Sequence, residues 1–426
     1  MENNVDYKYF EATHSGHGLQ NDDKIYKEAG LNPIKIKQDK AMMKLLIASV
    51  NKTNSNLSNL TMTTASTGQT EFVNAMNRAY MEVSTGVKSY SNAIIDAIDN
   101  LSSKGAVVKY PSGHQMSLES AARMNIITGV NQTCGKMQLL RAEELGWDLM
   151  EITAHGGARP EHASWQGKIV SRSGRKGYLS LDDIGYGKVT GFKGINCRHD
   201  WNPYFEGSSK TYTDEQLKKW QDETIEYKGK KMTKYEASQV QRNMERVIRQ
   251  DKKELAGIQG ILTSNNTDEK LIEDTKTKFA RKTLYYNSHK KELEEFTNAI
   301  ESTSDRTRMY IGQPEKTIKT NMKVITQIAN KYNSKIVGKK VNNFEIKEVS
   351  EHIISRTYAR NLDFEDIQDT LNNPLDYGKI KTDNQGRKSI NIYGKKVTVS
   401  INPDTGKLAT ARPTNKRELK RYEHKE

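Results

Sequence analysis

The stretch that decides the fold is T-A-H-G-G-A-R-P-E-H-A-S-W-Q-G-K at residues 153–168, followed after a glycine-rich interval by G-F-K-G-I-N-C-R-H-D-W-N-P-Y-F-E-G at residues 191–207. These two segments contain three of the nine histidines and one of the two cysteines in the 426-residue chain: His155, His162, His199 and Cys197. Histidine and cysteine side chains bind metal ions and take part in nucleophilic catalysis. Their concentration predicts that the two segments meet in space and form the centre of a small module.

Three interpretations of this cluster stay open. His155 and His162 form an H-x6-H pair and Cys197 and His199 a C-x-H pair, so the four side chains could close a tetrahedral zinc site. The H-x6-H spacing, however, fits neither a known zinc turn nor one face of a helix. The cluster could instead be a knot of hydrogen-bonded side chains that holds a glycine-rich core together. Cys197 could also be a nucleophile with a histidine base, although no recognised local signature surrounds it.

Length and composition bound the class of protein. A chain of 426 residues is expected to form two or three domains, each large enough to bury a core. The 67 Lys and Arg residues exceed the 53 Asp and Glu residues, and the formal net charge of +14 favours polyanionic partners such as DNA or RNA. Two widely separated cysteines indicate a reducing compartment. Neither a signal peptide nor an apolar run of roughly 18–20 residues is visible, so we expect a soluble protein with no membrane partner.

The residues N-terminal to the His/Cys stretch show mainly helical periodicity. Residues 1–38 are polar and weakly patterned, and we expect an arm. Apolar residues recur at helical spacing from residue 39, are interrupted at 56–67 by an expected cap and loop, and resume in a helix over 70–103. A β-hairpin and a helix capped by Ser117 follow. Residues 39–212 are therefore expected to form a core module around the His/Cys cluster.

The C-terminal half predicts charged helices and then a second α+β domain. We expect a charged helical hairpin over 213–302, which is more often solvated than a nucleic-acid grip. We expect a linker with one helix at residues 303–339. A domain of two helices followed by antiparallel strands follows at residues 340–414, and a basic tail at residues 415–426. The expected fold class is therefore multidomain α+β, with helix-rich N-terminal and middle regions around a small loop-rich module.

Several uncommon sequence motifs occur in the same order as in the phage minor capsid protein 2 family, and in this the chain resembles that family. Its members are relatives of the Mu F-like minor head proteins of tailed phages. The motifs are Y-P-S-G-H (110–114), S-L-E-S-A-A-R (117–123), I-T-A-H-G-G-A-R-P-E-H-A-S-W-Q-G-K (152–168), G-I-N-C-R-H (194–199) and F-E-G (205–207). The resemblance extends over residues 39–313. It implies a low-copy virion component that is assembled in the host cytoplasm, contacts portal, capsid or scaffold proteins during head morphogenesis, and travels with the packaged DNA.

The last domain resembles the barnase, EndoU, colicin-ribonuclease and RelE-like (BECR) nuclease toxins. The resemblance rests on H-I-x-x-R at 352–356, N-P after the second helix, Y-G-K-K-V-T-V-S-I-N-P-D-T-G (393–406) and T-A-R-P-T (410–414). It implies cleavage of RNA without a metal, in which a base takes the 2′-hydroxyl proton and cations hold the phosphorane charge. The residues implied are His352 as base or acid, Arg356, Arg360 and Arg412 as phosphate clamps, and Thr410 and Thr414 as positioning groups.

The alternative to catalysis is structural. Taken without the resemblance, the H-x3-R-x3-R face of residues 352–360 is equally typical of an ordinary solvent-exposed basic helix. The competing function is therefore a purely structural virion protein whose inactive C-terminal domain binds nucleic acid or a protein partner.

Overall fold

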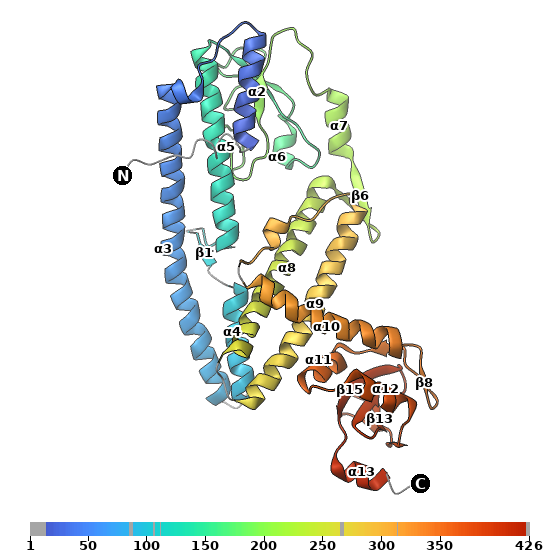
Figure 1. Ribbon diagram of the computed structural model, residues 1–426. Helices are drawn as coiled ribbons and strands as arrows, with labels where there is room; N and C mark the ends of the chain where they lie inside the picture. The colour runs from blue at the N-terminus through green and yellow to red at the C-terminus, as the bar shows by residue number, and fades with distance from the viewer. Residues whose placement is uncertain are drawn as a thin grey trace. The chain divides into compact units, whose positions relative to one another are not determined.

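The computed structural model describes residues 14–84, 88–104, 107–110, 112–264, 268–312 and 314–422 (Figure 1). Residues 1–13 of the expected arm and residues 423–426 of the expected tail lie outside them. Contacts divide the chain into two compact units: unit 1 comprises residues 1–70 and 105–240, and unit 2 comprises residues 71–104 and 241–426. Both units contain helices and sheets, so the expected α+β class is confirmed.

Unit 1 packs helices around small sheets. In chain order it contains α2 (His14–Glu28), η1 (Ile36–Gln38), the first part of α3 (Lys40–Ser84), β1 (Val107–Lys109), β2 (Gln115–Ser117), α5 (Leu118–Glu144), β3 (Leu149–Ile152), α6 (Pro160–Ala163), β4 (Ile169–Ser171), β5 (Trp201–Pro203), α7 (Asp214–Asp222), β6 (Thr224–Tyr227), β7 (Lys230–Thr233) and the start of α8 (Lys234–Thr263). β1 and β2 form the expected hairpin, and the Ser117 side chain caps α5 by accepting the Ser120 N–H.

The loop expected at residues 56–67 is wrong, because α3 runs through this segment without a break. Serine and threonine are tolerated there since their hydroxyls donate to carbonyl groups one helical turn earlier. Ser58 Oγ donates to the Asn54 carbonyl at 3.1 Å, and Thr53 Oγ1 donates to the Ser49 carbonyl at 3.0 Å. The helix expected over 70–103 is also divided differently, into the end of α3 and α4 (Tyr90–Lys104).

A three-stranded sheet in the order β4-β3-β5 forms the centre of unit 1. The middle strand β3 is buried along its whole length, and both neighbours pair with it in antiparallel register. The first half of the His/Cys stretch follows β3, and the second half leads into β5. The core beside this sheet combines aliphatic and aromatic side chains and includes Met150, Ile152, Trp165, Val170, Ile184, Phe192, Cys197 and Trp201.

The interval between β4 and β5 folds back on itself through close backbone contacts. A Cβ atom at Gly191 would lie 2.0 Å from the Gly185 carbonyl oxygen, so no other residue fits. We expect Gly191→Ala to destabilise unit 1 by about 3 kcal/mol, at the upper end of overpacking costs, in urea unfolding followed by tryptophan fluorescence. Gly68→Ala is the control: nothing lies within 4 Å of its Cβ position in α3, so it should stabilise by up to about 1 kcal/mol. Equal stability of the two variants would contradict the close approach.

Unit 2 combines a helical part with a C-terminal sheet domain. It contains the end of α3, α4, the rest of α8, α9 (Glu269–Ala299), η2 (Arg306–Met309), α10 (Glu315–Ile336), β8 (Lys340–Val341), β9 (Phe344–Glu345), β10 (Glu348–Val349), α11 (Glu351–Ala359), α12 (Phe364–Asn372), β11 (Asp376–Tyr377), β12 (Lys381–Thr382), β13 (Lys388–Tyr393), β14 (Val397–Ile401), β15 (Lys407–Pro413) and α13 (Lys416–Tyr422).

The helical part of unit 2 is held by apolar contacts and ion pairs. α8 and α9 share a core with α10 that includes Leu255, Ile258, Phe279, Ile318 and Met322. Lys278 of α9 pairs with Asp96 and Asp99 of α4 at 2.7 and 2.9 Å. The segment before α8 forms α7 and the β6–β7 hairpin, so α8 and α9 alone supply the helical pair within residues 213–302.

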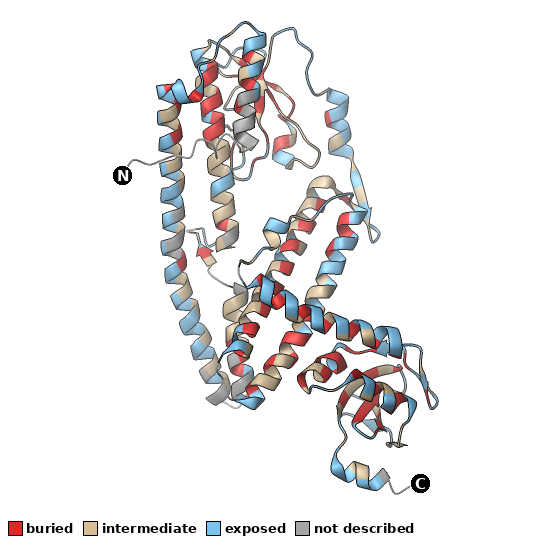
Figure 2. Ribbon diagram, in the orientation of Figure 1, coloured by how far each residue is buried: buried red, intermediate tan, exposed pale blue. Residues whose placement is uncertain are grey.

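The C-terminal domain consists of helices on one face of a sheet whose main order is β10-β15-β14-β13-β11. β10 pairs with β15 in parallel, whereas the other neighbours are antiparallel. Helices α11 and α12 contribute to a buried core with this sheet (Figure 2). α10 adds Ala329, Tyr332 and Ile336 to the same core, so the segment expected as a linker is packed against the domain. Among the described residues, no helix is long and apolar enough to cross a membrane.

Candidate functional site

Backbone and side-chain bonds join the two halves of the His/Cys stretch. The Thr153 N–H donates to the Asp200 carbonyl at 2.8 Å, and the Asp200 N–H donates to Thr153 Oγ1 at 2.8 Å. Arg159 Nη2 donates to the Ile195 carbonyl at 2.6 Å. These bonds tie the segment that carries His155 and His162 to the segment that carries Cys197 and His199.

The four side chains expected to meet do lie together. His162, Cys197 and His199 are buried, and each offers a ligand atom that lies within 4.8 Å of the other two. Cys197 Sγ and His199 Nδ1 are 3.7 Å apart. The His155 ring stacks on the His199 ring with centroids 4.6 Å apart and planes 24° apart. His155 therefore joins the group through ring contact rather than as a member of the tight triplet.

Hydrogen bonds orient each imidazole. His162 Nε2 lies 2.9 Å from the Thr190 carbonyl, and His199 Nε2 lies 3.2 Å from Gln166 Oε1. His155 Nδ1 lies 3.1 Å from the Gly156 carbonyl. Each of these oxygens can only accept, so the facing ring nitrogen carries the proton and the other nitrogen of each neutral ring keeps its lone pair.

Burial sets the protonation of the cluster. It lowers the pKa of His162 and, together with the neighbouring imidazoles His155 and His162, lowers the pKa of His199 to about 2. Burial also raises the pKa of the Cys197 thiol, although backbone N–H groups of His199 and Lys193 donate to the sulfur. Nucleophilic cysteines need a lowered pKa, so the interpretation of Cys197 as a nucleophile loses support.

A buried lysine that sequence reasoning did not identify lies beside the cluster. Lys193 is 0% exposed, and its Nζ donates to Asp200 Oδ1 at 2.6 Å and to Asn131 Oδ1 at 2.9 Å. Asn131 Nδ2 in turn donates to the Cys197 carbonyl at 2.9 Å. Lys193 thus fastens α5 to the loop that presents Cys197. Its φ of 58° places it in a conformation that sequence periodicity does not reveal.

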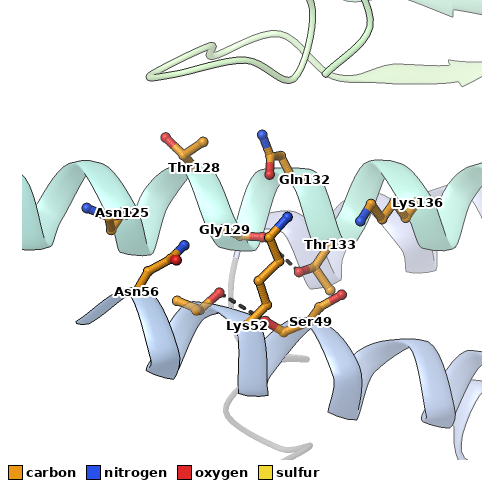
Figure 3. A pocket seen from close by; sticks show the side chains of 10 residues that line it. Ser49, Lys52, Asn56, Asn125, Thr128, Gly129, Gln132, Thr133 and Lys136 are labelled. Atoms are coloured by element: carbon orange, nitrogen blue, oxygen red, sulfur yellow. Dashed lines mark hydrogen bonds between the residues drawn. The ribbon is translucent and has the colours of Figure 1, made fainter. Parts of the chain in front are cut away.

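A polar furrow lies between α3 and α5 of unit 1 (Figure 3). Gly129 lets the two helices approach closely, since a Cβ at this position would lie 2.6 Å from Thr53 Oγ1. The lining is made of hydroxyl groups, amides and lysine side chains, from Ser49, Lys52, Thr53, Asn56, Asn125, Thr128, Gly129, Gln132, Thr133 and Lys136. The furrow is lined by residues of α3 and α5 alone, and none of the four His/Cys cluster residues lines it.

The basic face expected on α11 is present and includes a residue from another helix. Arg356 Nη1 and Arg360 Nε lie 3.6 and 3.9 Å from Glu273 Oε1 on α9. His352 is exposed, and burial together with the charges of Arg356, Arg281 and Arg360 lowers its pKa. Arg281 was missed because only the packing of α9 against α11 brings it here.

Of the other three candidate residues, Thr410 and Arg412 lie on β15, and Thr414 directly follows that strand. Ala411 points into the core that α11 covers, so its neighbours Thr410 and Arg412 point to the opposite face of the sheet. Arg412 forms a bidentate pair with Glu418 of α13 at 2.6 and 2.8 Å. Thr414 Oγ1 donates to the Gly394 carbonyl at 2.8 Å. The six candidate residues therefore form two groups: one consists of α11 residues and the C-cap residue Arg360, and the other of β15 residues and the following Thr414.

Arg360 links these two groups. Its Nη1 donates to the Ala411 carbonyl at 2.9 Å, on the stretch of β15 beyond its short pairing with β10. An edge carbonyl left without a partner costs free energy, so Arg360 has a structural role whether or not it contacts phosphate.

These features define a helix-rich α+β protein of two units, with a small His/Cys sheet module in unit 1 and an α+β domain at its C-terminal end. The family described as "Phage minor capsid protein 2" matches residues 11–284, and the chain belongs to this family. The resemblance to that family is therefore confirmed, whereas the C-terminal domain of residues 340–414 lies outside the matched residues and its resemblance to nuclease toxins stays a prediction.

One curated relative supports the assignment to phage structural proteins. The chain is 33% identical over 141 residues to a "Structural protein" of Lactococcus phage LL-H. The similarity covers 31% of this chain and 38% of that protein, so the chain spans well under half of the relative's length. No solved structure matches the chain.

Proposed function

We propose that this protein is a low-copy component of the phage head that acts at the portal during head morphogenesis. The family match over residues 11–284, which includes the whole His/Cys module, is the observation that carries the proposal. The proposed partners are portal, capsid or scaffold proteins and the packaged DNA, for which the net charge of +14 provides attraction.

Quantitative mass spectrometry of purified virions tests this proposal. We expect peptides of the chain at a small fraction of the abundance of the major capsid protein, and cross-links from the chain to the portal. Absence from DNA-filled heads, or an abundance equal to that of the major capsid protein, would contradict the proposed role.

We further propose that the C-terminal domain cleaves RNA without a metal. The α11 group supports this activity, because the positive charges of Arg281, Arg356 and Arg360 act on His352, while Glu273 pairs with Arg356 and Arg360. Such an excess of cations attracts phosphate, and arginine matches its geometry. His352 is exposed and, with its lowered pKa, is neutral at neutral pH, as a general base must be.

In the proposed reaction, His352 takes the proton from a ribose 2′-hydroxyl, and the oxygen attacks the adjacent phosphorus. Arg356 and Arg281 hold the charge that develops on the phosphorane, and a protonated group returns a proton to the leaving 5′-oxygen. DNA lacks the 2′-hydroxyl and is bound without being cut. Arg412, Thr410 and Thr414 hold a neighbouring phosphate from the other side of β15.

Two carboxylates compete with RNA for these cations. Because each carboxylate neutralises a different group, replacing them one at a time tests the two groups separately. Glu273 neutralises the α11 group, and Glu418 neutralises Arg412. We expect Glu273→Gln to increase cleavage of total tRNA by the full-length protein in EDTA several-fold. Glu418→Gln should increase RNA affinity only if Arg412 contacts phosphate. RNA that stays intact with wild-type protein and with both variants would leave the structural alternative, in which the domain only binds.

A further inference from the structure

We propose that His162, Cys197 and His199, with His155 as the fourth ligand, bind one Zn²⁺ ion that holds the two halves of the His/Cys stretch together. The proposal is independent of the virion and nuclease functions proposed above. It concerns the cluster in unit 1 and rests on the distances between the ligand atoms, their burial and the hydrogen bonds of the imidazole rings.

The triplet has nearly the dimensions of a tetrahedral zinc site. Zinc bonds of about 2.3 Å to sulfur and about 2.0–2.1 Å to nitrogen place neighbouring ligand atoms about 3.4–3.6 Å apart at tetrahedral angles. Cys197 Sγ and His199 Nδ1 are already 3.7 Å apart. The largest separation within the triplet is below 4.8 Å, so closure around an ion requires movements of about 1 Å.

The imidazoles are oriented as metal ligands are. Histidine ligands usually donate their second ring nitrogen to a carbonyl, a carboxylate or another acceptor, which fixes the ring and raises the basicity of the coordinating nitrogen. His162 donates to the Thr190 carbonyl and His199 to Gln166 Oε1, both through Nε2. In each ring Nδ1 remains as the lone-pair donor, and for His199 this is the nitrogen nearest to the sulfur.

His155 supplies the fourth lone pair. Its Nδ1 bonds to the Gly156 carbonyl, which leaves Nε2 as the free nitrogen. Among the residues that the structure describes, this buried Nε2 has no hydrogen-bond partner. A buried polar atom without a partner is costly, and coordination removes the cost. The ring lies against His199, so a rotation about its side-chain bonds brings Nε2 toward the triplet.

The ligand set selects zinc, and the module gains a structural cross-link from it. Three imidazoles and one thiolate in a tetrahedral arrangement suit zinc, whereas calcium and magnesium prefer oxygen ligands. Four protein ligands leave no open position, which is typical of structural rather than catalytic zinc. The strands of this module have only 3 or 4 residues each, so an ion that joins residues 155–162 to residues 197–199 stabilises an otherwise loop-rich segment.

Metal analysis of the full-length protein tests the site. We expect close to one zinc ion per chain after purification without chelators, and Cys197→Ser or His199→Ala should lose it. Cys134→Ser and His114→Ala, which change the other cysteine and an exposed histidine of unit 1, should keep it. Cobalt substitution of the wild-type protein should give a thiolate-to-cobalt charge-transfer band. The cobalt measurement uses only the wild-type protein, so it does not depend on whether a variant folds. Absence of both zinc and the cobalt band would overturn the proposal.

Two further variants test the individual roles. Gln166→Leu removes the acceptor of His199 without removing a ligand, and we expect about 10–100-fold weaker zinc binding in competition with a chelator. His155→Ala should weaken binding while the cobalt–thiolate band persists. Unchanged affinity in His155→Ala would overturn its assignment as the fourth ligand, and unchanged affinity in Gln166→Leu would overturn the orienting role of the amide.

Discussion

Replacing Lys193 with methionine is expected to destabilise unit 1 by about 3–5 kcal/mol, because removing one partner of a buried ion pair leaves the other charge without compensation. The Lys193 side chain is 1% exposed, whereas that of Asp200 is 28% exposed. Water can therefore reach the remaining carboxylate, and we expect a value at the lower end of this range. Loss of the bond to Asn131 Oδ1 adds to the effect, since Asn131 also bonds the Cys197 carbonyl.

Tryptophan fluorescence isolates this effect from unit 2. All four tryptophans, at positions 147, 165, 201 and 220, belong to unit 1, so the urea transition of the emission reports that unit alone. Lys188→Met is the matched control from the same loop, since its side chain is 67% exposed and lies 3.7 Å from a nearly fully exposed Asp182. We expect it to change stability by no more than about 0.5 kcal/mol. Equal effects of the two variants would show that the Lys193–Asp200 pair does not stabilise the module.

His352→Ala is expected to reduce RNA cleavage by about 10²–10⁴-fold, the usual contribution of a general base. The variant should still fold, because His352 is exposed at the first turn of α11 while the adjacent Ile353 and Ile354 supply the buried contacts. Arg387→Ala is the control: it removes an exposed arginine of the same domain that pairs only with nearby Asp383 in the described structure, and cleavage should be unchanged. Equal cleavage by wild type and His352→Ala would remove the assignment.

The pH profile of cleavage gives a second test of His352. Burial and the positive charges of Arg356, Arg281 and Arg360 lower its pKa below the ordinary value of 6.5. The neutral ring therefore persists to lower pH than in a free histidine, and cleavage should decline only as the pH falls below 6.5. A rate that rises on acidification through this range would show that His352 acts as an acid instead.

The sequence was sufficient to predict the assembly of the His/Cys cluster but not its supports. Rare residue types in ordered words, such as H-G-G-A-R-P-E-H and N-C-R-H, predicted that the two segments meet. Lys193 and Gln166, which hold the cluster, are of common residue types in polar surroundings. Only the fold shows that one is fully buried and that the other bonds both His199 and the His155 N–H.

Helix lengths and unit boundaries were the hardest to predict. Serine, threonine and asparagine at 56–67 favour turns, yet side-chain donors that bond to the preceding helical turn let α3 continue. Two of the three unit boundaries fall inside α3 and α8, where no proline or glycine cluster marks them. In the C-terminal domain the strands and the Asp363 start of α12 followed from local signals, whereas the carboxylate of Glu273 reaches Arg356 and Arg360 through tertiary packing alone.

The interleaving of the two units has a consequence for synthesis and for proteolysis. The chain passes between the units three times, after residues 70, 104 and 240, so a single protease cut at any of these points leaves the halves tethered. On the ribosome, α4 emerges long before α9, whose Lys278 pairs with Asp96 and Asp99. A nascent chain stopped near residue 240 can therefore complete unit 1 while α4 still waits for its partner, and truncated products should expose that helix to degradation.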